Sequence, residues 1–339
     1  MKNNKTLRIV ILFVVLCLTL GAFIVYDNFK LDITEYTLES DNLPESFNEF
    51  KIVHLSDLHN TEFGEDNEKL LKIIKEQKPD AVFVTGDTID GFYTNTAIPI
   101  NLFKEVLKIC DVYLVVGNHE SRVNINVYTE FIDTLNEIGV IVLKDNSAYI
   151  EKGKEKIQII GLNDASEYKL DYNNDYRDKI TEAINNINDK NSFSILLSHH
   201  PELFPEYKNT DVDLVFSGHA HGGQFRLPFI GGIIAPEQGL FPEFDAGVFN
   251  ENNTTMVVSR GLGNSIVPVR INNSPEIVVT TLKPTDWNSI SRFNFKMFLY
   301  RNQAFYQLHR YPHQNKDKEL KTRVGDACRL FCRNYKVQL

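Results

Sequence analysis

Cysteine is scarce in this 339-residue sequence, which contains only four. Cys328 and Cys332 lie near the carboxyl end, Cys17 lies in an apolar run, and Cys110 ends a helical pattern. Disulfide-stapled domains need several cysteines that can pair within one compact region. The sequence therefore excludes a disulfide scaffold. Its length allows one large domain or two ordinary ones with a substantial hydrophobic core.

Basic charge is also lacking from most of the chain. The formal net charge is -9, and it is unevenly spread. Residues 283–339 carry a balance of +8, so residues 1–282 carry -17. Non-specific nucleic-acid binding depends on a basic footprint. An acidic body of this kind excludes nucleic acid as the expected partner.

The amino-terminal run Ile9–Tyr26 has 18 residues and no charge. At about 1.5 Å per residue, such a helix spans about 27 Å, enough for a bilayer core. Lys2, Lys5 and Arg8 precede the run, and acidic residues appear only after it. By the positive-inside rule, residues 1–8 are cytoplasmic, residues 9–26 form a transmembrane anchor, and the remainder lies outside the cytoplasm. The sequence thus predicts a single-pass protein of the cell membrane.

A cleaved signal peptide is the main alternative for this run. The sequence Phe23-Ile24-Val25-Tyr26 at its end offers no small-x-small cleavage site, and there is no twin-arginine signal. Leu16 rather than a small residue precedes Cys17, which argues against a lipoprotein signal. A buried core helix is a third alternative, disfavoured by the terminal position and uniform apolarity. We therefore favour an uncleaved anchor.

Strand-like and helix-like patterns alternate along the acidic body, which predicts an α/β domain. Residues 27–49 are interpreted as a juxtamembrane linker and an entry strand. The predicted strands are 50–55, 81–85, 112–116, 140–143, 157–160, 194–197, 214–216, 255–259, 267–271 and 276–282; the predicted helices are 66–77, a segment ending at 110, 127–138 and 176–187. The basic extension 284–339 fits no such pattern. It could be an amphipathic membrane-surface segment or an extension without a role.

Five short segments place potential metal ligands directly after apolar runs. They are Asp57-Leu58-His59, Gly86-Asp87, Gly117-Asn118-His119-Glu120, Ser198-His199-His200 and Gly218-His219-Ala220-His221. Strand ends in α/β sheets are where ligands and reacting groups collect. Imidazole, carboxylate and carboxamide together suit Mn, Fe or Zn better than a thiolate site would. One such residue alone is usually a turn or capping residue, but five segments in this order are a specific signal.

The order resembles that of the calcineurin-like metallophosphoesterase superfamily, whose pattern is D-x-H, G-D, G-N-H-[DE], H and G-H-x-H. Segments 52–60, 218–224 and 259–265 are also similar to a membrane-associated bacterial subgroup of the YkuE and YaeI type. The resemblance covers roughly residues 36–283. It implies a metallophosphoesterase domain over residues 50–283, built as a four-layer sandwich of two mixed β-sheets flanked by helices.

The resemblance further implies two divalent metal ions that share one carboxylate, that of Asp87. The ligands it implies for the first metal are Asp57, His59 and His221, and those for the second are Asn118, His199 and His219. Residues two apart in an extended segment face the same way, so we expect Asp57 and His59 to converge on one metal. The glycines that follow His221 permit a turn that could aim the last two histidines at neighbouring metals.

The family also implies a chemistry for these residues. Its nucleophile is a metal-bridging hydroxide, and His119 protonates the leaving alkoxide or stabilises the transition state. General acid help of this kind is typically worth about 10²–10⁴-fold in rate. Glu120 could orient that imidazole.

Other polar residues near the motifs are weaker candidates. His54 is interpreted as structural, and His200 as structural or as a support for a ligand. Arg122 and Arg260 are candidates for a phosphate clamp, with a structural salt bridge as the alternative for Arg260. Protein phosphatases of the superfamily carry an arginine just before G-N-H-E, where this chain has Val116. That difference favours a small or lipid-like phosphoester over a phosphoprotein.

We therefore expect a membrane-anchored phosphoesterase that hydrolyses a phosphodiester or pyrophosphate bond. A substrate that is lipid-linked or derived from the cell envelope follows from the location alone. A phosphomonoesterase, a metal-binding envelope scaffold without catalysis, and an enzyme facing the cytoplasm are the alternatives. The native metal, the substrate and the oligomeric state do not follow from the sequence.

Overall fold

The protein is described from a computed structural model, which places residues 2–164, 174–264 and 267–285. The predicted basic extension lies outside the described residues from position 286 onward. The first helix, α1 (Lys2–Phe29), contains a stretch, Leu7–Phe29, that is long and apolar enough to cross a membrane. The apolar helix expected from the sequence is therefore present, with its carboxyl end at Phe29 rather than Tyr26.

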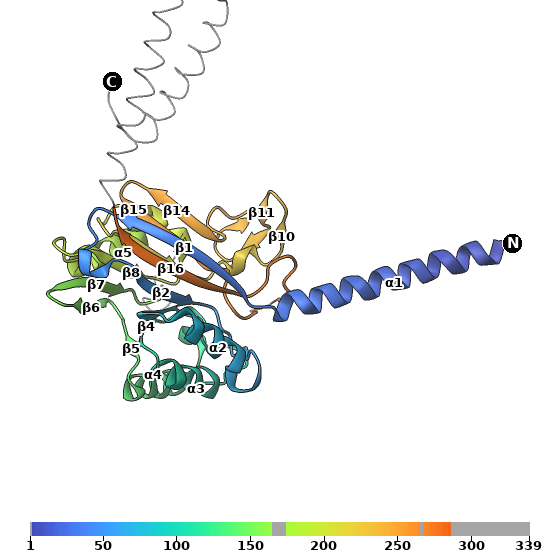
Figure 1. Ribbon diagram of the computed structural model, residues 1–339, viewed down its shortest axis with the longest axis horizontal. Coiled ribbons are helices and arrows are strands. Elements are labelled where there is room, and N and C mark those ends of the chain that lie inside the picture. The colour runs from blue at the N-terminus through green and yellow to red at the C-terminus, as the bar shows by residue number, and fades with distance from the viewer. Residues whose placement is uncertain (1, 165–173, 265–266, 286–339) are drawn as a thin grey trace, which may run out of the picture. The chain divides into compact units, whose positions relative to one another are not determined.

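Two six-stranded mixed sheets form the centre of the body (Figure 1). The first has the order β1-β16-β2-β3-β4-β5, with β1 Asp32–Ser40, β16 Glu276–Pro284, β2 Phe50–Leu55, β3 Ala81–Thr85, β4 Asp111–Val115 and β5 Ile141–Val142. The second has the order β14-β15-β9-β8-β7-β6, with β14 Gly247–Glu251, β15 Thr254–Val258, β9 Leu214–Ser217, β8 Ser194–Leu197, β7 Glu155–Gly161 and β6 Asn146–Lys152. Within the first sheet, β2, β3 and β4 run parallel, as do β7, β8 and β9 within the second.

Helices cover the outer face of each sheet. In Figure 1, α2 (Glu68–Gln77), α3 (Ala97–Val106) and α4 (Ile125–Ile138) lie together on the side of the first sheet. Helices α5 (Asn174–Ile187) and α6 (Phe204–Tyr207) pack on the second sheet, where their buried side chains share a cluster with β8 and β9. Within the described residues there are also five short 3₁₀ segments: Glu45–Phe47, Glu65–Asn67, Glu120–Arg122, Pro201–Leu203 and His221–Gly223.

The buried strands explain why their sequences are apolar without alternation. In β3, Val82 and Val84 pack in the cluster that contains the side chains of α2, α3 and α4. Phe83, between them, packs in the cluster between the two sheets, against Phe216 of β9. Successive strand residues point to opposite faces, and both faces here are covered. The predicted four-layer α/β fold is confirmed.

One predicted strand is wrong. Residues 267–271 form no regular strand; among these described residues, only Ile271 makes an isolated bridge, to Phe225. Pro268 has no N–H to give to a ladder. The carbonyls of Val267 and Val269 instead accept hydrogen bonds from the side-chain amide of Gln224. These two carbonyls therefore pair with a side chain and not with a neighbouring strand.

Two small antiparallel hairpins follow His221. The first pairs β10 (Arg226–Leu227) with β11 (Gly231–Gly232), and the second pairs β12 (Ile234–Ala235) with β13 (Gly239–Leu240). We call residues 227–241 the apolar loops, because six of their large hydrophobic side chains are exposed. These are Leu227, Phe229, Ile230, Ile234, Leu240 and Phe241.

Candidate metal centre

The motif residues lie in the loops that follow β2, β3, β4, β8 and β9. The first three strands belong to one sheet and the last two to the other. Parallel strands of one sheet end at the same edge, so their loops meet there. The structure brings together all seven residues expected as metal ligands, in two groups that have Asp87 in common.

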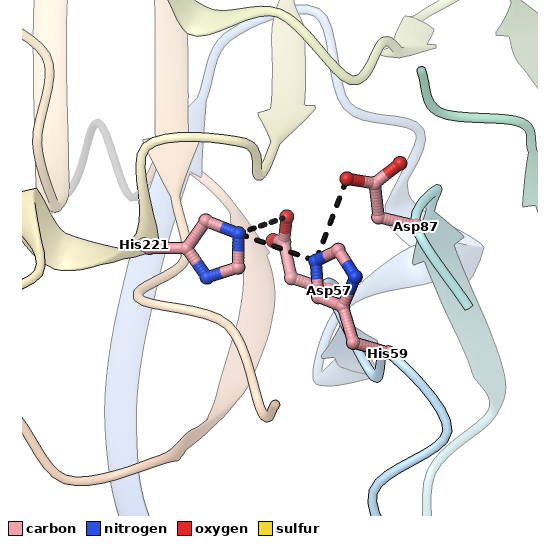
Figure 2. Close-up of side chains that lie close together, drawn as sticks. All are labelled: Asp57, His59, Asp87 and His221. Atoms are coloured by element: carbon pink, nitrogen blue, oxygen red, sulfur yellow. Dashed lines mark hydrogen bonds and ion pairs between the residues drawn. The ribbon is translucent and has the colours of Figure 1, made fainter. Parts of the chain in front are cut away.

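The first group contains Asp57, His59, Asp87 and His221 (Figure 2). One potential ligand atom from each lies within 4.8 Å of those from the others. His59 Nε2 is 3.5 Å from Asp87 Oδ2 and 3.2 Å from His221 Nε2. His221 Nε2 is in turn 3.5 Å from Asp57 Oδ1. All four residues are buried.

The second group contains Asp87, His199, His219 and Asn118. His199 Nε2 lies 3.3 Å from Asp87 Oδ2, 3.0 Å from His219 Nδ1 and 3.2 Å from Asn118 Oδ1. The carboxylate and the imidazole nitrogens can present lone pairs to one another, and Asn118 can turn either its amide oxygen or its amide nitrogen toward them. A cation among them would satisfy every one. The donor set of both groups therefore fits divalent metal ions that accept nitrogen and oxygen ligands.

The pKa values of the two buried carboxyl groups, those of Asp57 and Asp87, are shifted in opposite directions. Burial raises the pKa of Asp57. Burial also acts to raise the pKa of Asp87, but the neighbouring His199 and His59 hold it well below the usual range. The shared carboxylate is therefore ionised and surrounded by imidazoles, which is the charge arrangement a bridging ligand requires.

The backbone at these ligands is unusual. Five of the seven have a positive φ: Asp57 (53°), His59 (45°), Asp87 (51°), His219 (62°) and His221 (47°). Left-handed backbone is uncommon in residues other than glycine and clusters at functional sites. The expectation that Asp57 and His59 converge because their segment is extended is wrong. They converge because both residues turn into the left-handed region.

Two glycines make the close packing of these loops possible. A Cβ on Gly218 would lie 2.5 Å from Asp57 Oδ2 and would collide with Ser56. A Cβ on Gly117 would collide with the Asp87 carboxylate. The glycines in the G-H-x-H and G-N-H-E motifs are therefore required for contact between loops from different strands.

Glu120 has a different role from the one expected. Its carboxylate does not orient His119 but binds the backbone of two ligand loops. Oε2 accepts from Asp87 N (2.9 Å) and Gly117 N (2.8 Å), while Oε1 accepts from the N–H groups of Thr88 and Ile89 and from the Thr88 hydroxyl. Burial raises the pKa of Glu120 to about 7. Glu120 fixes the β3 and β4 loops relative to each other.

His119 lies beside the first group, with its ring 4.4 Å from that of His59. Its Nδ1 accepts a hydrogen bond from Gly91 N at 3.0 Å, and its Nε2 lies 3.4 Å from Arg122 Nη1. An imidazole and a cation therefore lie side by side at the edge of the centre. Burial lowers the pKa of His119.

The structure places the remaining candidate residues, Arg260, His54 and His200, in different environments. Arg260 makes ion pairs with Glu276 (3.0 Å) and Asp32 (3.6 Å), which is the structural alternative. His54 is buried in β2 with its Nε2 2.8 Å from Thr85 Oγ1. His200 lies with its ring 4.5 Å from that of His219, one residue away from the ligand His199.

Residues not identified from the sequence support the ligand rings. Glu237, in the β12–β13 hairpin, lies 2.5 Å from His219 Nε2. Arg270 is fully buried, with Nη2 3.3 Å from His221 Nδ1 and Nη1 2.7 Å from the Arg260 carbonyl. Burial lowers the pKa of Arg270 to about 10, so the guanidinium is charged at neutral pH. Nothing in the local sequence marks Glu237 or Arg270, because only the fold brings them to the centre.

Comparison with known proteins agrees with this geometry. A family model described as calcineurin-like phosphoesterase matches residues 50–223. The metallophosphoesterase YkuE of Bacillus subtilis is 32% identical over 267 residues, covering 76% of this chain and 87% of the relative. The phosphodiesterase YaeI of Escherichia coli is 26% identical over 241 residues, covering 69% of this chain and 82% of the relative.

A third relative comes from Danio rerio and is named a transmembrane protein with metallophosphoesterase domain. It is 27% identical over 267 residues, which cover 74% of this chain and 57% of that protein. The chain described here belongs to the calcineurin-like phosphoesterase family. It is thus a member of a family of metal-dependent hydrolases, and it carries a buried cluster of histidines and aspartates that can bind metal.

Proposed function

We propose that this protein is a membrane-anchored phosphoesterase that uses two divalent metal ions, Mn, Fe or Zn, to hydrolyse a phosphodiester or pyrophosphate bond. The observation that carries the proposal is the pair of ligand groups that share Asp87. Asp57, His59 and His221 would hold one ion, and Asn118, His199 and His219 the other.

When bound, such ions neutralise phosphoryl oxygens and allow water to be deprotonated near neutral pH. The protein's own residues supply the rest of the chemistry. His119 in its protonated form can pass a proton to the leaving oxygen. Arg122, whose Nη1 lies 3.4 Å from the His119 ring, can bind a non-bridging phosphoryl oxygen. Asn118 would offer its amide oxygen to the second ion, whereas the reversed amide would donate to Asp87 and accept from Arg122.

Two features support a diester or pyrophosphate over a phosphoprotein. Val116, at the position before G-N-H-E, is buried and offers no charge to a phosphate dianion. The relative YaeI is named a phosphodiesterase. A phosphomonoesterase remains the alternative that the assay below distinguishes.

The location follows from α1 and its flanking charges. Lys2, Lys5 and Arg8 precede the apolar stretch, which favours a cytoplasmic amino terminus and an extracytoplasmic metal centre. The substrate would then be lipid-linked or derived from the envelope. A reporter fused after Leu282 tests this orientation. Activity of a reporter that works only in the cytoplasm would overturn it.

Hydrolysis by the full-length protein in detergent tests the chemistry. The protein is stripped of metal and titrated with Mn, Zn or Fe, using bis-p-nitrophenyl phosphate and p-nitrophenyl phosphate. We expect metal-dependent turnover that favours the diester. Replacement His119→Ala should lower kcat by about 10²–10⁴-fold while bound metal is unchanged.

Two outcomes would contradict the proposal. A preference for the monoester would show that the protein is a phosphomonoesterase and not a diesterase. Full rescue of a deletion phenotype by the His119→Ala protein would show that catalysis is not the function, and would favour a metal-binding scaffold.

A further inference from the structure

The apolar loops concentrate large hydrophobic side chains that are exposed. Phe229 is 109% exposed, and Ile230, Leu240 and Phe241 are each more than 60% exposed. Scattered exposed hydrophobic residues are ordinary, but a concentrated set marks a surface that meets protein or membrane. Here the exposed residues occupy two consecutive hairpins, and Ile234 pairs directly with Leu240.

These loops connect directly to the metal centre. They begin six residues after His221, and Ile233 N donates to the Gly223 carbonyl at the end of the ligand turn. Glu237, at the tip of the second hairpin, lies 2.5 Å from the ring of His219. The exposed hydrophobic residues therefore flank a hairpin whose tip supports a ligand of the candidate centre.

The same loops begin where the candidate membrane span ends. Asn28, in the last turn of α1, exchanges two hydrogen bonds of 2.8 Å with the backbone of Arg270. Asp27 accepts hydrogen bonds from Asn273 N and from the Ser274 hydroxyl. The segment 270–274 thus holds the carboxyl end of α1.

This segment also holds the base of the first hairpin. Arg226 N donates to the Ile271 carbonyl at 3.0 Å, and the Asn272 side chain donates to the Arg226 carbonyl. Leu227, the first of the exposed hydrophobic residues, follows immediately. One five-residue segment therefore bonds both to the end of the apolar helix and to the start of the apolar loops.

We propose that the apolar loops insert into the surface of the same bilayer that α1 crosses, and so hold the metal centre at the membrane. This inference rests on the proposed anchoring by α1. A bilayer is the occupant that the continuity with α1 favours, because any surface bonded to the end of a spanning helix lies at the interface. Aromatic and aliphatic side chains enter the headgroup and upper acyl region. The centre would then meet phosphoesters whose head groups lie at the bilayer surface.

Tryptophan quenching by brominated lipids tests the insertion in the full-length protein. Trp287 is the only tryptophan in the sequence. In a Trp287→Phe background, Phe229→Trp places a reporter on the apolar loops. Tyr149→Trp, on the edge strand β6 of the second sheet, is the matched aromatic control. Each protein is reconstituted into phosphatidylcholine vesicles with plain acyl chains or with bromine on the upper acyl carbons.

We expect brominated lipid to lower the emission of the Phe229→Trp protein and to leave that of the Tyr149→Trp protein unchanged. Adding Phe241→Asp should reduce the quenching at position 229. Equal emission in the two lipids at position 229 overturns the proposal. A blue-shifted but unquenched emission there also overturns it, since it would indicate cover by a second copy or another protein.

Vesicle flotation separates this inference from the proposed anchoring. A protein that floats with vesicles but shows no quenching at position 229 is anchored by α1 without insertion of the loops. A protein that does not float with vesicles would contradict both the anchoring by α1 and the insertion of the loops. Turnover of bis-p-nitrophenyl phosphate, a soluble substrate, should be the same for the Phe229→Trp and Tyr149→Trp proteins. Absence of turnover in the parent protein would contradict the proposed chemistry and not the insertion.

Discussion

His219 is held by contacts on both sides of its ring. Nδ1 lies 3.0 Å from His199 Nε2 inside the second ligand group, and Nε2 lies 2.5 Å from Glu237. A carboxylate that accepts from one ring nitrogen fixes the tautomer and leaves the other nitrogen free to bind metal. Glu237 therefore decides which nitrogen of His219 faces the candidate centre.

We predict that Glu237→Gln weakens metal binding by about 10–100-fold, the usual effect of losing such a support. The amide oxygen accepts more weakly than the carboxylate, so the His219 ring is held less firmly in its ligating orientation. Metal affinity is measured by competition with a chromophoric chelator. Glu243→Gln, at an exposed position in the same region, is the control and should bind metal normally. Equal affinities for the two variants would refute the assigned role.

His200 is a second buried residue whose charge affects the fold. It lies between Asp164 and Glu202, with its ring nitrogens 2.7 Å from each carboxylate. Burial opposes protonation, but the carboxylates of Glu202 and Asp164 raise the pKa of His200 well above 6.5. The imidazolium is therefore the form that this pocket stabilises.

This shift predicts a loss of stability on the alkaline side. A folded-state pKa above the unfolded value of about 6.5 gives a stabilising contribution that is complete below that pH. The contribution disappears as pH rises through the folded-state pKa. Thermal unfolding in excess chelator, followed against pH, should show a falling melting temperature that His200→Gln makes flatter. An unchanged slope in that variant would assign the effect to another group.

At the scale of elements, the turns after the strands determine the geometry of the centre. The β9 turn approaches the β2 turn so closely that Gly218 packs against Ser56 and Asp57. The two strands belong to different sheets. Contact between these turns therefore joins the two halves of the candidate site.

We predict that Gly218→Ala separates these turns and abolishes high-affinity metal binding. The added methyl has no room, because it would collide with the short, buried side chains of Ser56 and Asp57. Overpacking typically costs about 1–3 kcal/mol. Gly21→Ala, in α1, has no atom within 4 Å of the added Cβ and is the control. Metal affinity and melting temperature are measured for both variants. The prediction is refuted if both variants match the parent in both quantities.

At the scale of the whole molecule, two sheets from distant parts of the chain meet at one buried cluster of donors. Asp57 and His221 are separated by more than half of the body, yet their ligand atoms are 3.5 Å apart. Ions that bind this arrangement bind only the folded chain. Metal should therefore act as a stabiliser of the whole α/β body.

Removal of metal should lower the stability of the protein. A ligand present at about 100 times its dissociation constant stabilises the native state by about 2.7 kcal/mol. We expect chelator to lower the melting temperature of the full-length protein in detergent, and added Mn or Zn to restore it. Asp87→Asn, which lacks the shared carboxylate, should respond to neither. A parent protein whose melting temperature ignores chelator would contradict a metal centre at this position.

Much of this organisation could be predicted from the sequence, because its causes are local. Apolar runs such as Ala81–Thr85 mark strands buried on both faces, and motif residues after them mark the edge where ligands gather. The helix of α1 follows from its composition. The prediction of a strand at residues 267–271 was wrong, because side chains remote in sequence bind the backbone of this segment. These are the side chains of Gln224 and Asn28.

The resemblance of the motifs to a known family implied the four layers and the grouping of the ligands. The sequence by itself determined the strand ends and the residue types of the candidate ligands. These depend on hydrophobic periodicity and on side-chain chemistry, both of which are written along the chain. Only the tertiary structure decided that Glu120 binds backbone rather than His119, and that Glu237 and Arg270 support the rings. Those facts depend on distances between remote segments, which become fixed only when the two sheets pack.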